Sequence, residues 1–331
     1  VGISLKHYRY LGVDTGGTFT DFVLLSNGTI SIHKVLSTPD DPSNAILQGI
    51  SELGLAEDVA LGRLVIIHGS TVATNAALER KGAKTVYVAN KGLKDVLTLA
   101  RQNRLELYNL TPTPIEPPVP EALCLEIDCR LDCDGHEVKS LEKQDLDRLV
   151  AEIKALNPDS VAINLLFSFL GDGHETQIEP ALADWFFVSR SSCVLPESKE
   201  YERGIATWLN AWLEPKVDHY LGKLVSELHG CSVSMMQSSG GTVDVAQAAK
   251  RTVNLLLSGP AGGLAATHYI GEMIGESRFI TFDMGGTSTD VALIDGAIQL
   301  TNEGRIGHWP VAVPMVDMHT IGAGGGSLGW V

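Results

Sequence analysis

The chain has 331 residues, of which 44% are hydrophobic, so it can bury a large core and form about two domains. Its formal net charge of −15 argues against nucleic acid as a partner, because phosphate backbones are bound by faces rich in Lys and Arg. The longest largely apolar run, Val161–Leu170, is too short to cross a bilayer, and the N-terminal residues lack a signal-peptide layout. We therefore expect a cytoplasmic protein without a membrane segment.

The first predicted elements are strands joined by short turns. Three strands are expected at Tyr10–Val13, Phe22–Leu25 and Ile30–Val35, with a turn at Asn27-Gly28. A helix should follow, because Asp41 can cap it, Pro42 suits its first position and Gly54 can end it.

Strands and helices alternate through the next part of the chain. Strands are predicted at Leu64–His68, Thr85–Ala89 and Val161–Phe169, and helices at Thr71–Lys81 and from Ser140 to Asn157. The proline-rich segment 111–120 must be an extended loop and is expected to begin an insertion. This alternation is typical of an α/β protein.

Cysteine spacing raises the question of a zinc site. Five cysteines form a sparse and odd-numbered set, which makes a disulfide framework improbable. Cys124, Cys129, Cys133 and His136 lie near one another in sequence, but their spacing matches no common structural zinc pattern. We interpret the segment as a strand that approaches a turn at Asp134-Gly135.

The pattern becomes helical again between Glu200 and Leu228, with a break predicted at Pro215. Trp208 and Trp212 lie four residues apart on one helical face, a spacing that favours core packing over a ligand platform. The last third of the chain is dense in glycine. Strong strand patterns separate the glycine clusters, which argues against a low-complexity linker.

One octapeptide pattern, Asp-x-Gly-Gly-Thr-x-Thr-Asp, occurs twice. Residues 14–21 and 283–290 agree at six of eight positions. Each copy follows one predicted strand and precedes another, so each forms a hairpin whose tip presents successive backbone N–H groups. A single Gly-Gly hairpin is usually an ordinary turn, but two near-identical copies indicate two homologous half-domains facing each other across one nucleotide cleft.

The residues of the octapeptide suit phosphate and metal binding. Glycines let the backbone approach a phosphate, and threonine hydroxyls add hydrogen-bond donors. We predict that Asp14 and Asp283 act in catalysis by holding Mg²⁺, usually through water. Asp21 and Asp290 are secondary candidates, or else cap the turns by accepting from backbone amides. The residues predicted to grip the phosphates of ATP are Thr15, Gly16, Gly17, Thr18, Met284, Gly285, Gly286, Thr287 and Ser288.

These motifs and several others resemble the hydantoinase/5-oxoprolinase family, which includes acetone-carboxylase-type subunits. Besides the two octapeptides, the segments that carry the resemblance are His68–Gly82, Glu200–Arg203, Asn210-Ala211, Gln237–Gly241, Leu257–Gly263 and Thr320–Ser327. Ser70 stands where the family usually has Thr, and Gly204 stands where a hydroxyl residue is common. Members continue well past the glycine-rich segment, so we expect this chain to be a C-terminally truncated form.

The resemblance implies an α/β fold of the actin/sugar-kinase/Hsp70 type, with duplicated ribonuclease H-like domains, mixed sheets and flanking helices. Residues 1–190 would form the N-terminal region with the first phosphate loop, and residues 191–331 the first part of the catalytic region with the second. It also implies ATP-dependent hydrolysis of a cyclic amide, such as a hydantoin or 5-oxoproline, through phosphorylation of the carbonyl oxygen. Phosphorylation would weaken the amide resonance that protects an unstrained lactam from water.

Further candidate residues surround the two loops. Gly322, Gly324 and Gly325 are predicted to let the backbone approach adenosine or its phosphates. Asp317 and His319 are candidate metal ligands just upstream. His68, Thr71 and Asn75 follow a predicted strand, where polar side chains of α/β sheets often face a ligand, and are candidate substrate contacts.

Several other functions remain open on sequence alone. They are an ATP-dependent ketone carboxylase subunit, a sugar- or acetate-kinase-like phosphotransferase and a non-catalytic ATP-switched module. The expected partners are a small cyclic amide or ketone, a second subunit similar to hydantoinase B, and further copies of the chain in a homo-oligomer.

Overall fold

A computed structural model describes residues 9–103, 106–111, 116–228, 230–285, 289–307 and 309–328. The chain divides into two compact units, and each is assembled from separated stretches of sequence. Unit 1 contains residues 1–76, 217–304 and 314–331, and unit 2 contains residues 77–216 and 305–313. The family regions predicted at 1–190 and 191–331 stay a prediction, since these spatial units follow different boundaries.

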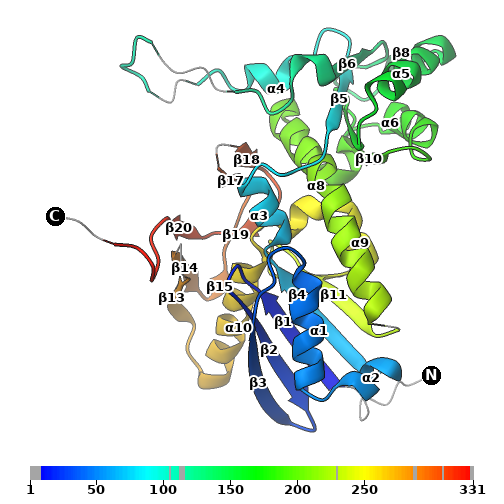
Figure 1. The fold of residues 1–331 in the computed structure, drawn as a ribbon. Helices are drawn as coiled ribbons and strands as arrows, with labels where there is room; N and C mark the ends of the chain where they lie inside the picture. Colours follow the sequence, from blue (N-terminus) through cyan, green and yellow to red (C-terminus); the bar gives the residue numbers. More distant parts are fainter. Residues whose placement is uncertain are drawn as a thin grey trace. The chain divides into compact units, whose positions relative to one another are not determined.

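Unit 1 contains a mixed six-stranded sheet with the order β12-β11-β4-β1-β2-β3 (Figure 1). Strands β1, β4 and β11 run parallel to one another, whereas β2, β3 and β12 are antiparallel to their neighbours. The strands span β1 Arg9–Thr15, β2 Phe19–Ser26, β3 Thr29–Leu36, β4 Leu64–Ser70, β11 Ser232–Met236 and β12 Thr242–Asp244. The three N-terminal strands and the turn at Asn27-Gly28, where both residues have positive φ, confirm the sequence prediction.

Helix α1 (Pro42–Glu52) lies on β1, β2 and β3. As predicted, the Asp41 carboxylate caps it by accepting from the Ser43 amide at 3.2 Å. The ring of Phe22 lies against Gly49, where a Cβ would come within 2.2 Å of it, so α1 can approach the sheet closely only with glycine at this position. Short helices in this unit are α2 Ala56–Ala60, α9 Val245–Lys250 and a 3-10 turn at Thr252–Leu255.

Helix α10 (Ser258–Ile274) connects the first sheet of unit 1 to a second one. It contacts β4 and β11 of the first sheet and β13, β14 and β15 of the second. The second sheet contains β13 Arg278–Met284, β14 Thr289–Asp295, β15 Ala297–Ile298 and β20 His319–Ile321, and smaller pairs involve β16 Leu300–Thr301 and β19 Met315–Val316. Ala261 and Leu264 of α10 pack with Ala292 and Val316 in the core between them.

Unit 2 is built on a parallel sheet with the order β10-β9-β5-β6. Its strands are β5 Thr85–Asn90, β6 Cys124–Ile127, β9 Ser160–Asn164 and β10 Phe187–Arg190, and smaller pairs are β7 Arg130–Leu131 with β8 Glu137–Lys139 and β17 Gly304–Ile306 with β18 Trp309–Val311. Its helices are α4 Val96–Leu99, α5 Lys143–Leu156, α6 Gly173–Ile178 and α7 Ser191–Val194, with 3-10 turns at Glu121–Leu123 and Glu179–Ala181. The core combines Val86, Val88, Val161 and Ile163 of the strands with Leu149 and Ile153 of α5.

The predicted helix break at Pro215 is wrong. One helix, α8, runs from Glu200 to Glu227 through the proline. A proline inside a helix leaves carbonyls of the preceding turn without their usual donors. The carbonyl that loses its donor to Pro215 is that of Ala211, four residues earlier, and the next carbonyl, that of Trp212, accepts from the Ala83 amide at 2.8 Å.

Two other predicted elements are too long. The helix expected over 71–81 is α3 Val72–Leu78, and Arg80 just after it has a φ of 55°, which no α-helix contains. The strand expected over 161–169 ends at Asn164, and Phe167 adopts a φ of 61° in the turn that follows. The residues that follow α3 are the exposed and charged Glu79, Arg80 and Lys81, whereas the turn after Asn164 still buries Leu165 and Ser168. Of the proline-rich segment, residues 112–115 lie outside the described part of the chain.

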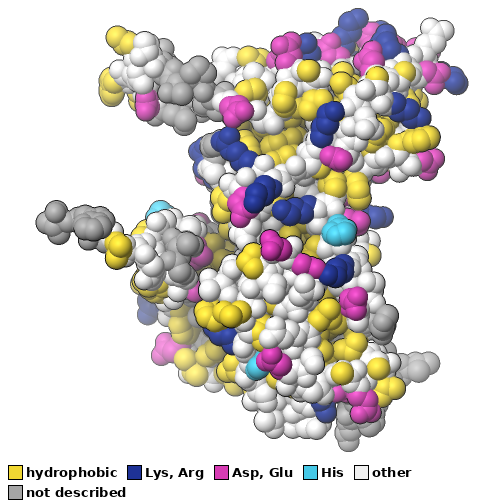
Figure 2. Space-filling model, in the orientation of Figure 1, with side chains coloured by type: hydrophobic (Ala, Val, Ile, Leu, Met, Phe, Trp, Pro, Cys, Tyr) yellow, Lys and Arg dark blue, Asp and Glu magenta, His cyan; other side chains and the backbone are white. Residues whose placement is uncertain are grey.

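Within the described residues, no helix is long and apolar enough to cross a membrane. Figure 2 shows one face of the chain, on which acidic and basic side chains are interspersed with hydrophobic ones.

Candidate functional site

The two octapeptides form hairpins with the same register. In the first, β1 and β2 pair Asp14 with Asp21 and Thr15 with Thr20. In the second, β13 and β14 pair Asp283 with Asp290 and Met284 with Thr289. The first and last aspartates of each octapeptide therefore lie directly across from each other, and both hairpins belong to unit 1.

The first hairpin has a tip built for close approach by a ligand. The Gly16 amide donates to the Phe19 carbonyl at 3.0 Å and closes the turn. Ser37 holds the tip from one side, because its hydroxyl donates to the Gly16 carbonyl and its amide to the Thr18 carbonyl. The amides of Gly17 and Thr18 donate no hydrogen bond among the described residues, so both remain available for an anion.

The junction of β4 and α3 lies beside this hairpin. Strand β4 runs parallel to β1, so Gly69 lies next to Asp14 and Ser70 next to Thr15. The Thr71 hydroxyl donates to the Thr15 carbonyl at 2.9 Å, and the exposed Asn75 amide donates to the Thr71 hydroxyl at 3.3 Å. The structure thus brings Thr71 and Asn75 to the edge of the first loop, where sequence analysis placed a ligand.

Two glycines form a cradle around the Asp14 carboxylate. A Cβ built on Gly69 would lie 3.1 Å from Asp14 Oδ1, and one built on Gly259 would lie 3.2 Å from the same atom. Gly69 ends β4 and Gly259 is in the first turn of α10. The Ser258 hydroxyl fixes this arrangement by donating to the Ser70 carbonyl at 3.2 Å. Any side chain at Gly69 or Gly259 would press on the carboxylate.

The surroundings of Asp14 disfavour its negative charge. Desolvation by neighbouring protein atoms, followed by the charges of Asp21 and Asp283, raises the pKa of Asp14 to about 6. The side chain remains accessible to solvent, but it lies in a recess that limits its hydration. Asp283 belongs to the second hairpin of the same unit, and its charge makes the smallest of these three contributions to the pKa of Asp14.

The carboxylates of Asp14, Asp21 and Asp283 interact through their charges, although their ligand atoms do not all lie within 4.8 Å of one another. Lys34 offsets Asp21 through an ion pair of 2.9 Å, whereas the charges of Asp21 and Asp283 still act on Asp14. Aspartates that repel one another in a partly desolvated recess are the donor set that Mg²⁺ takes in proteins. Binding of Mg²⁺ by Asp14 and Asp283 stays a prediction.

Among the described residues, no backbone amide of its own turn donates to the last aspartate of either octapeptide, and Gly286, Thr287 and Ser288 of the second turn lie outside that part of the chain. Asp21 forms the ion pair with Lys34, and Asp290 accepts from the Thr320 hydroxyl at 2.6 Å. Both carboxylates contact a side chain on the neighbouring strand rather than backbone amides. Asp21 thereby contacts β3, and Asp290 contacts β20.

The described part of the second loop ends at Gly285. Gly286, Thr287 and Ser288 lie outside the described residues. The glycine-rich segment after β20 lies beside what is described, because the Gly325 amide donates to the Gly285 carbonyl at 2.9 Å. The Thr289 hydroxyl also donates to the Ala323 carbonyl at 2.7 Å, so Gly322, Gly324 and Gly325 line the second hairpin.

Thr15 contributes to the first loop differently from Asp14. Successive residues of a strand point to opposite faces, so the buried Thr15 hydroxyl points away from the Asp14 carboxylate. Its Oγ1 has no hydrogen-bond partner among the described residues. Contact of Thr15 with a phosphate stays a prediction, and its carbonyl already holds Thr71 in place.

Asp317 and His319 stay unsupported as metal ligands. The Asp317 amide donates to the Gln299 carbonyl, and His319 pairs with Val291 between β20 and β14. Among the described residues, the one group of three residues whose ligand atoms lie within 4.8 Å of one another is Asp132, Asp134 and His136.

That acidic group is explained by a turn. Asp132 Oδ1 accepts from the amides of Asp134 and His136 at 2.9 and 2.8 Å, and Gly135 has a positive φ of 83°. The turn predicted at Asp134-Gly135 is therefore confirmed. Of the nearby cysteines, Cys124 and Cys129 are buried and Cys133 is exposed, and burial raises the thiol pKa of Cys129 to about 12.

His68 is buried in the core of unit 1. Its Nε2 contacts the Tyr220 hydroxyl at 2.5 Å and its Nδ1 the Val13 carbonyl at 3.2 Å, so both ring nitrogens have protein partners. Burial lowers the pKa of His68 to about 4, which keeps the ring neutral. Direct contact between His68 and a substrate, as sequence analysis suggested, has no support in this arrangement.

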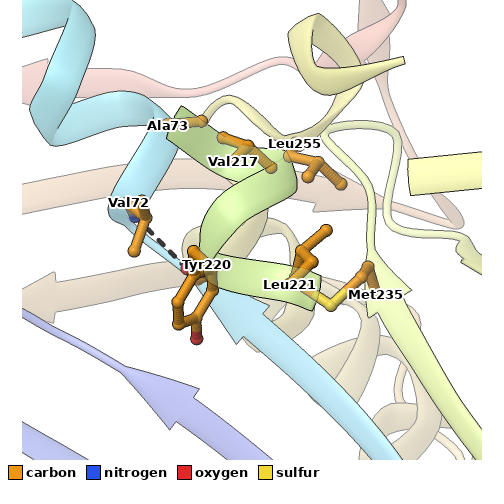
Figure 3. A pocket seen from close by; sticks show the side chains of 8 residues that line it. Val72, Ala73, Val217, Tyr220, Leu221, Met235 and Leu255 are labelled. Carbon is orange, nitrogen blue, oxygen red and sulfur yellow. Dashed lines mark hydrogen bonds between the residues drawn. The ribbon is translucent and has the colours of Figure 1, made fainter. Parts of the chain in front are cut away.

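The space next to Tyr220 is too small for a substrate. Figure 3 shows Tyr220 and Leu221 of α8, Val72 of α3 and Met235 of β11 around a cavity of about 10 Å³. Such a volume holds at most one water molecule. His68 and Tyr220 thus position the β4–α3 junction through packing.

Another motif singled out in the sequence, Glu200–Arg203, stabilises unit 2. The fully buried Arg203 guanidinium donates to Asn164, to the Leu165 and Glu197 carbonyls, and to Glu200. The neighbouring Gly204 has no space for a side chain, because a Cβ would lie 2.7 Å from the Asn164 amide and 3.0 Å from the Tyr87 hydroxyl. The absence of a hydroxyl residue at 204 therefore follows from packing.

Sequence analysis missed the glycine cradle. Both Gly69 and Gly259 belong to recognised motifs, but neither received a role, because nothing in the sequence shows that two segments so far apart meet at one carboxylate. Glycine directly after a strand, or at the start of a helix, was the available signal.

Comparisons with known proteins agree with this arrangement. Residues 10–185 match the family model of the hydantoinase/oxoprolinase N-terminal region, and residues 203–331 match that of hydantoinase/oxoprolinase. The chain is 32% identical over 98% of its length to the caprolactamase subunit alpha of Pseudomonas jessenii and spans 49% of that protein. It is 31% identical over 95% of its length to 5-oxoprolinase 1 of Arabidopsis thaliana and spans 28% of it.

Two solved structures share the fold. The ATP-dependent caprolactamase of Pseudomonas jessenii superimposes with a TM-score of 0.85 at 30% identity, over 97% of this chain and 49% of that one. Nucleotide-free acetone carboxylase, described in connection with ATP-dependent acetone carboxylation, gives a TM-score of 0.80 at 26% identity, over 97% of this chain and 48% of that one. The present chain thus spans about half the length of these two proteins.

Proposed function

Since the chain belongs to the hydantoinase/oxoprolinase family, we propose that it takes part in ATP-dependent opening of a cyclic amide such as a hydantoin or 5-oxoproline. The observation that carries this proposal is the pair of hairpins with identical register, the first of which has its leading carboxylate, that of Asp14, between Gly69 and Gly259. The likeness to a caprolactamase and a 5-oxoprolinase supports the substrate class.

The equivalent hairpins support duplicated, actin-like ATPase lobes. Each lobe would present one glycine hairpin to the nucleotide, with Gly16, Gly17 and Thr18 on one side and Gly285 on the other. The free amides of Gly17 and Thr18 would bind phosphate oxygens without basic side chains, in keeping with the acidic composition.

Asp14 and Asp283 would hold Mg²⁺ at this site, which would neutralise charge on the transferred phosphoryl group. The glycine cradle keeps the Asp14 carboxylate in one place, so that the γ-phosphate and the amide oxygen can be aligned. Ser37 and Thr71 hold the first loop from two sides, which limits the reorganisation needed when a phosphate binds.

The chemistry follows from the stability of amides. Resonance withdraws electrons from the amide nitrogen, and an amine is a poor leaving group, so water attacks a lactam slowly. Transfer of the γ-phosphoryl group to the carbonyl oxygen weakens that resonance and makes the carbon more electrophilic. Overall, one lactam, one ATP and two waters give one ring-opened amino acid, ADP and phosphate.

The direct test is Mg·ATP turnover by the full chain with 5-oxoproline, hydantoin and ε-caprolactam. We expect phosphate release in equal amount to ring-opened product, detected by mass spectrometry, and neither product from Asp14→Asn. A stable phosphorylated product would indicate a kinase instead, and ATP turnover indifferent to every lactam would contradict the proposal.

Ketone carboxylation is the second candidate, because the chain also shares its fold with acetone carboxylase. Stimulation of ATP turnover by acetone with bicarbonate, and not by lactams, would favour it. Since the caprolactamase relative is named as a subunit, we also propose that a second subunit, similar to hydantoinase B, completes the enzyme. Co-purification with that subunit would test this.

A further inference from the structure

Unit 2 contains a cavity of about 280 Å³ that none of the predicted site residues lines. Its wall is formed by α4 and the turn after it, by the start of α8, and by the β17–β18 hairpin. The volume is close to the lower end of small-molecule pockets, roughly 300 Å³. The cavity therefore has the size for one compact ring.

One wall of the cavity is a rigid aromatic surface. Trp309 meets Trp208 at 5.0 Å and Trp212 at 5.5 Å between ring centroids, nearly perpendicular to both. Trp208 and Trp212 are themselves stacked at 5.1 Å, and Trp208 is buried. These contacts fix the Trp309 ring, so that it can pack against a flat ligand without losing much side-chain freedom.

The polar groups of the cavity are balanced in charge. Arg101 donates to both carboxylate oxygens of Glu202, through Nε at 2.8 Å and through Nη2. Arg305 and Glu116 also line the cavity, and Glu116 forms an ion pair of 3.0 Å with Arg80, so both carboxylates of the wall have a basic partner. A wall of this kind favours a neutral, dipolar ligand over an ion of either sign.

The backbone around Arg101 is strained. Ala100 has a φ of 49° and a ψ of −141°, and Gln102 has a φ of 53°. Neither residue is glycine, so each conformation costs about 1–3 kcal/mol and persists only where surrounding structure enforces it. The two strained residues flank Arg101 and direct its guanidinium to Glu202.

We propose that this cavity binds a small cyclic amide, with its carbonyl oxygen on Arg101, its N–H on Glu202 and its ring on Trp309. In a ring the amide is cis, so the N–H and the carbonyl point to the same side, as the adjacent donor and acceptor require. The Arg101–Glu202 pair can stay formed, since a guanidinium has five donor hydrogens and a carboxylate about four acceptor positions. The choice of amides rests on the proposed function.

Calorimetric titration of the full chain without ATP tests this site. The probes are 2-pyrrolidone and N-methyl-2-pyrrolidone, which share a ring but differ in the N–H donor. We expect 2-pyrrolidone to bind at least roughly tenfold more tightly than its N-methyl analogue, and Arg101→Gln or Glu202→Gln to weaken it by a similar factor. Circular dichroism checks that the variants fold.

Arg148→Gln is the matched control. Arg148 is also half-exposed and ion-paired, at 56% exposure against 50% for Arg101, but lies on α5 outside this cavity. It should leave the binding of 2-pyrrolidone unchanged. Equal affinity for both probes, equal affinity in all three variants, or tighter binding of acetate than of 2-pyrrolidone would overturn the proposal.

The two proposals fail in different ways. If lactams stimulate ATP turnover but Arg101→Gln leaves their half-saturating concentration unchanged, the cavity assignment is wrong and the proposed function stands. If 2-pyrrolidone binds as expected but no lactam stimulates ATP turnover, the cavity stands and the proposed function is wrong.

Discussion

Asp14 in unit 1 and Arg203 in unit 2 show two ways in which a fold can hold a charge away from bulk water. Arg203 is fully buried, and its guanidinium donates to side-chain and backbone oxygens of its own unit, including the carboxylate of Glu200. Asp14 lies in a recess between two glycines, and the charges nearest to it are carboxylates.

The difference is between a charge that the protein pairs and a charge for which we propose a ligand. Each nitrogen of the Arg203 guanidinium donates to an oxygen of the protein, so the residue holds segments of unit 2 together. The surroundings of Asp14 disfavour its ionised form, and this raises its pKa to about 6. Carboxylates so placed are typical of metal and catalytic sites.

The largest loss of stability is expected when Arg203, whose charge is fully paired within the protein, is replaced. Arg203→Met should lower the free energy of unfolding by about 3–5 kcal/mol, because it leaves Glu200, Asn164 and two carbonyls without their donor. Urea denaturation measures this loss. Arg148→Met, which breaks an exposed ion pair, should cost about 1 kcal/mol or less. Similar losses of stability in Arg203→Met and Arg148→Met would contradict the view that Arg203 is a structural charge.

A smaller effect, confined to ligand binding, is expected at the cradle. Gly259→Ala would place a methyl group 3.2 Å from Asp14 Oδ1 and displace the carboxylate. We expect the affinity for Mg·ATP, measured by calorimetry, to fall about tenfold, or about 1.4 kcal/mol.

The control for the cradle is Gly263→Ala, one turn further along α10, where a Cβ meets nothing within 4 Å. It should bind Mg·ATP as the unmodified chain does. Equal loss in both variants would mean that the effect comes from the helix and not from the carboxylate.

Asp14→Asn should stabilise the chain above pH 6. The fold raises the pKa of Asp14 above its value in the unfolded chain. The unmodified chain therefore loses stability as the pH rises from about 4 to about 6, and this stability stays lost above pH 6. The full shift would amount to about 3 kcal/mol, and solvent accessibility reduces our expectation to roughly 1 kcal/mol.

Urea unfolding should show that Asp14→Asn is more stable than the unmodified chain at pH 7.5 but not at pH 4. Saturating Mg²⁺ should narrow that gap, since the cation stabilises only the aspartate. A variant less stable than the unmodified chain at pH 7.5 without Mg²⁺ would contradict the assignment of Asp14 as an uncompensated charge.

The smallest loss of stability is expected at Tyr220, which contacts the buried His68. Tyr220→Phe removes the partner of His68 Nε2 and should lower stability by about 1 kcal/mol, as thermal unfolding would show. Nucleotide affinity should stay unchanged, because His68 is buried and neutral. A tenfold loss of affinity for the nucleotide would indicate that His68 takes part in ligand binding after all.

Sequence alone predicted the parts of the fold that local patterns determine. The two hairpins and the capped helix α1 follow from turn residues, strand patterns and capping. Continuity of α8 through Pro215 was missed because proline usually ends a helix, and nothing in the local sequence shows that this helix continues. His68 looked exposed at a strand end, and only the packing of Tyr220 buries it.

The candidate site was predicted as a list of residues rather than as a geometry. The octapeptides identified Asp14 and Asp283, but their mutual repulsion and the cradle at Gly69 and Gly259 arise from segments that meet only in the fold. Spatial neighbours of this kind leave no local trace in one sequence.

The most direct test of the central claim is the affinity of the full chain for ATP, measured by calorimetry with Mg²⁺ and with EDTA, for the unmodified chain and for Asp14→Asn. We predict that Mg²⁺ strengthens binding to the unmodified chain at least roughly tenfold at pH 7.5 and much less in the variant. Equal dependence on Mg²⁺ in both proteins would contradict the account.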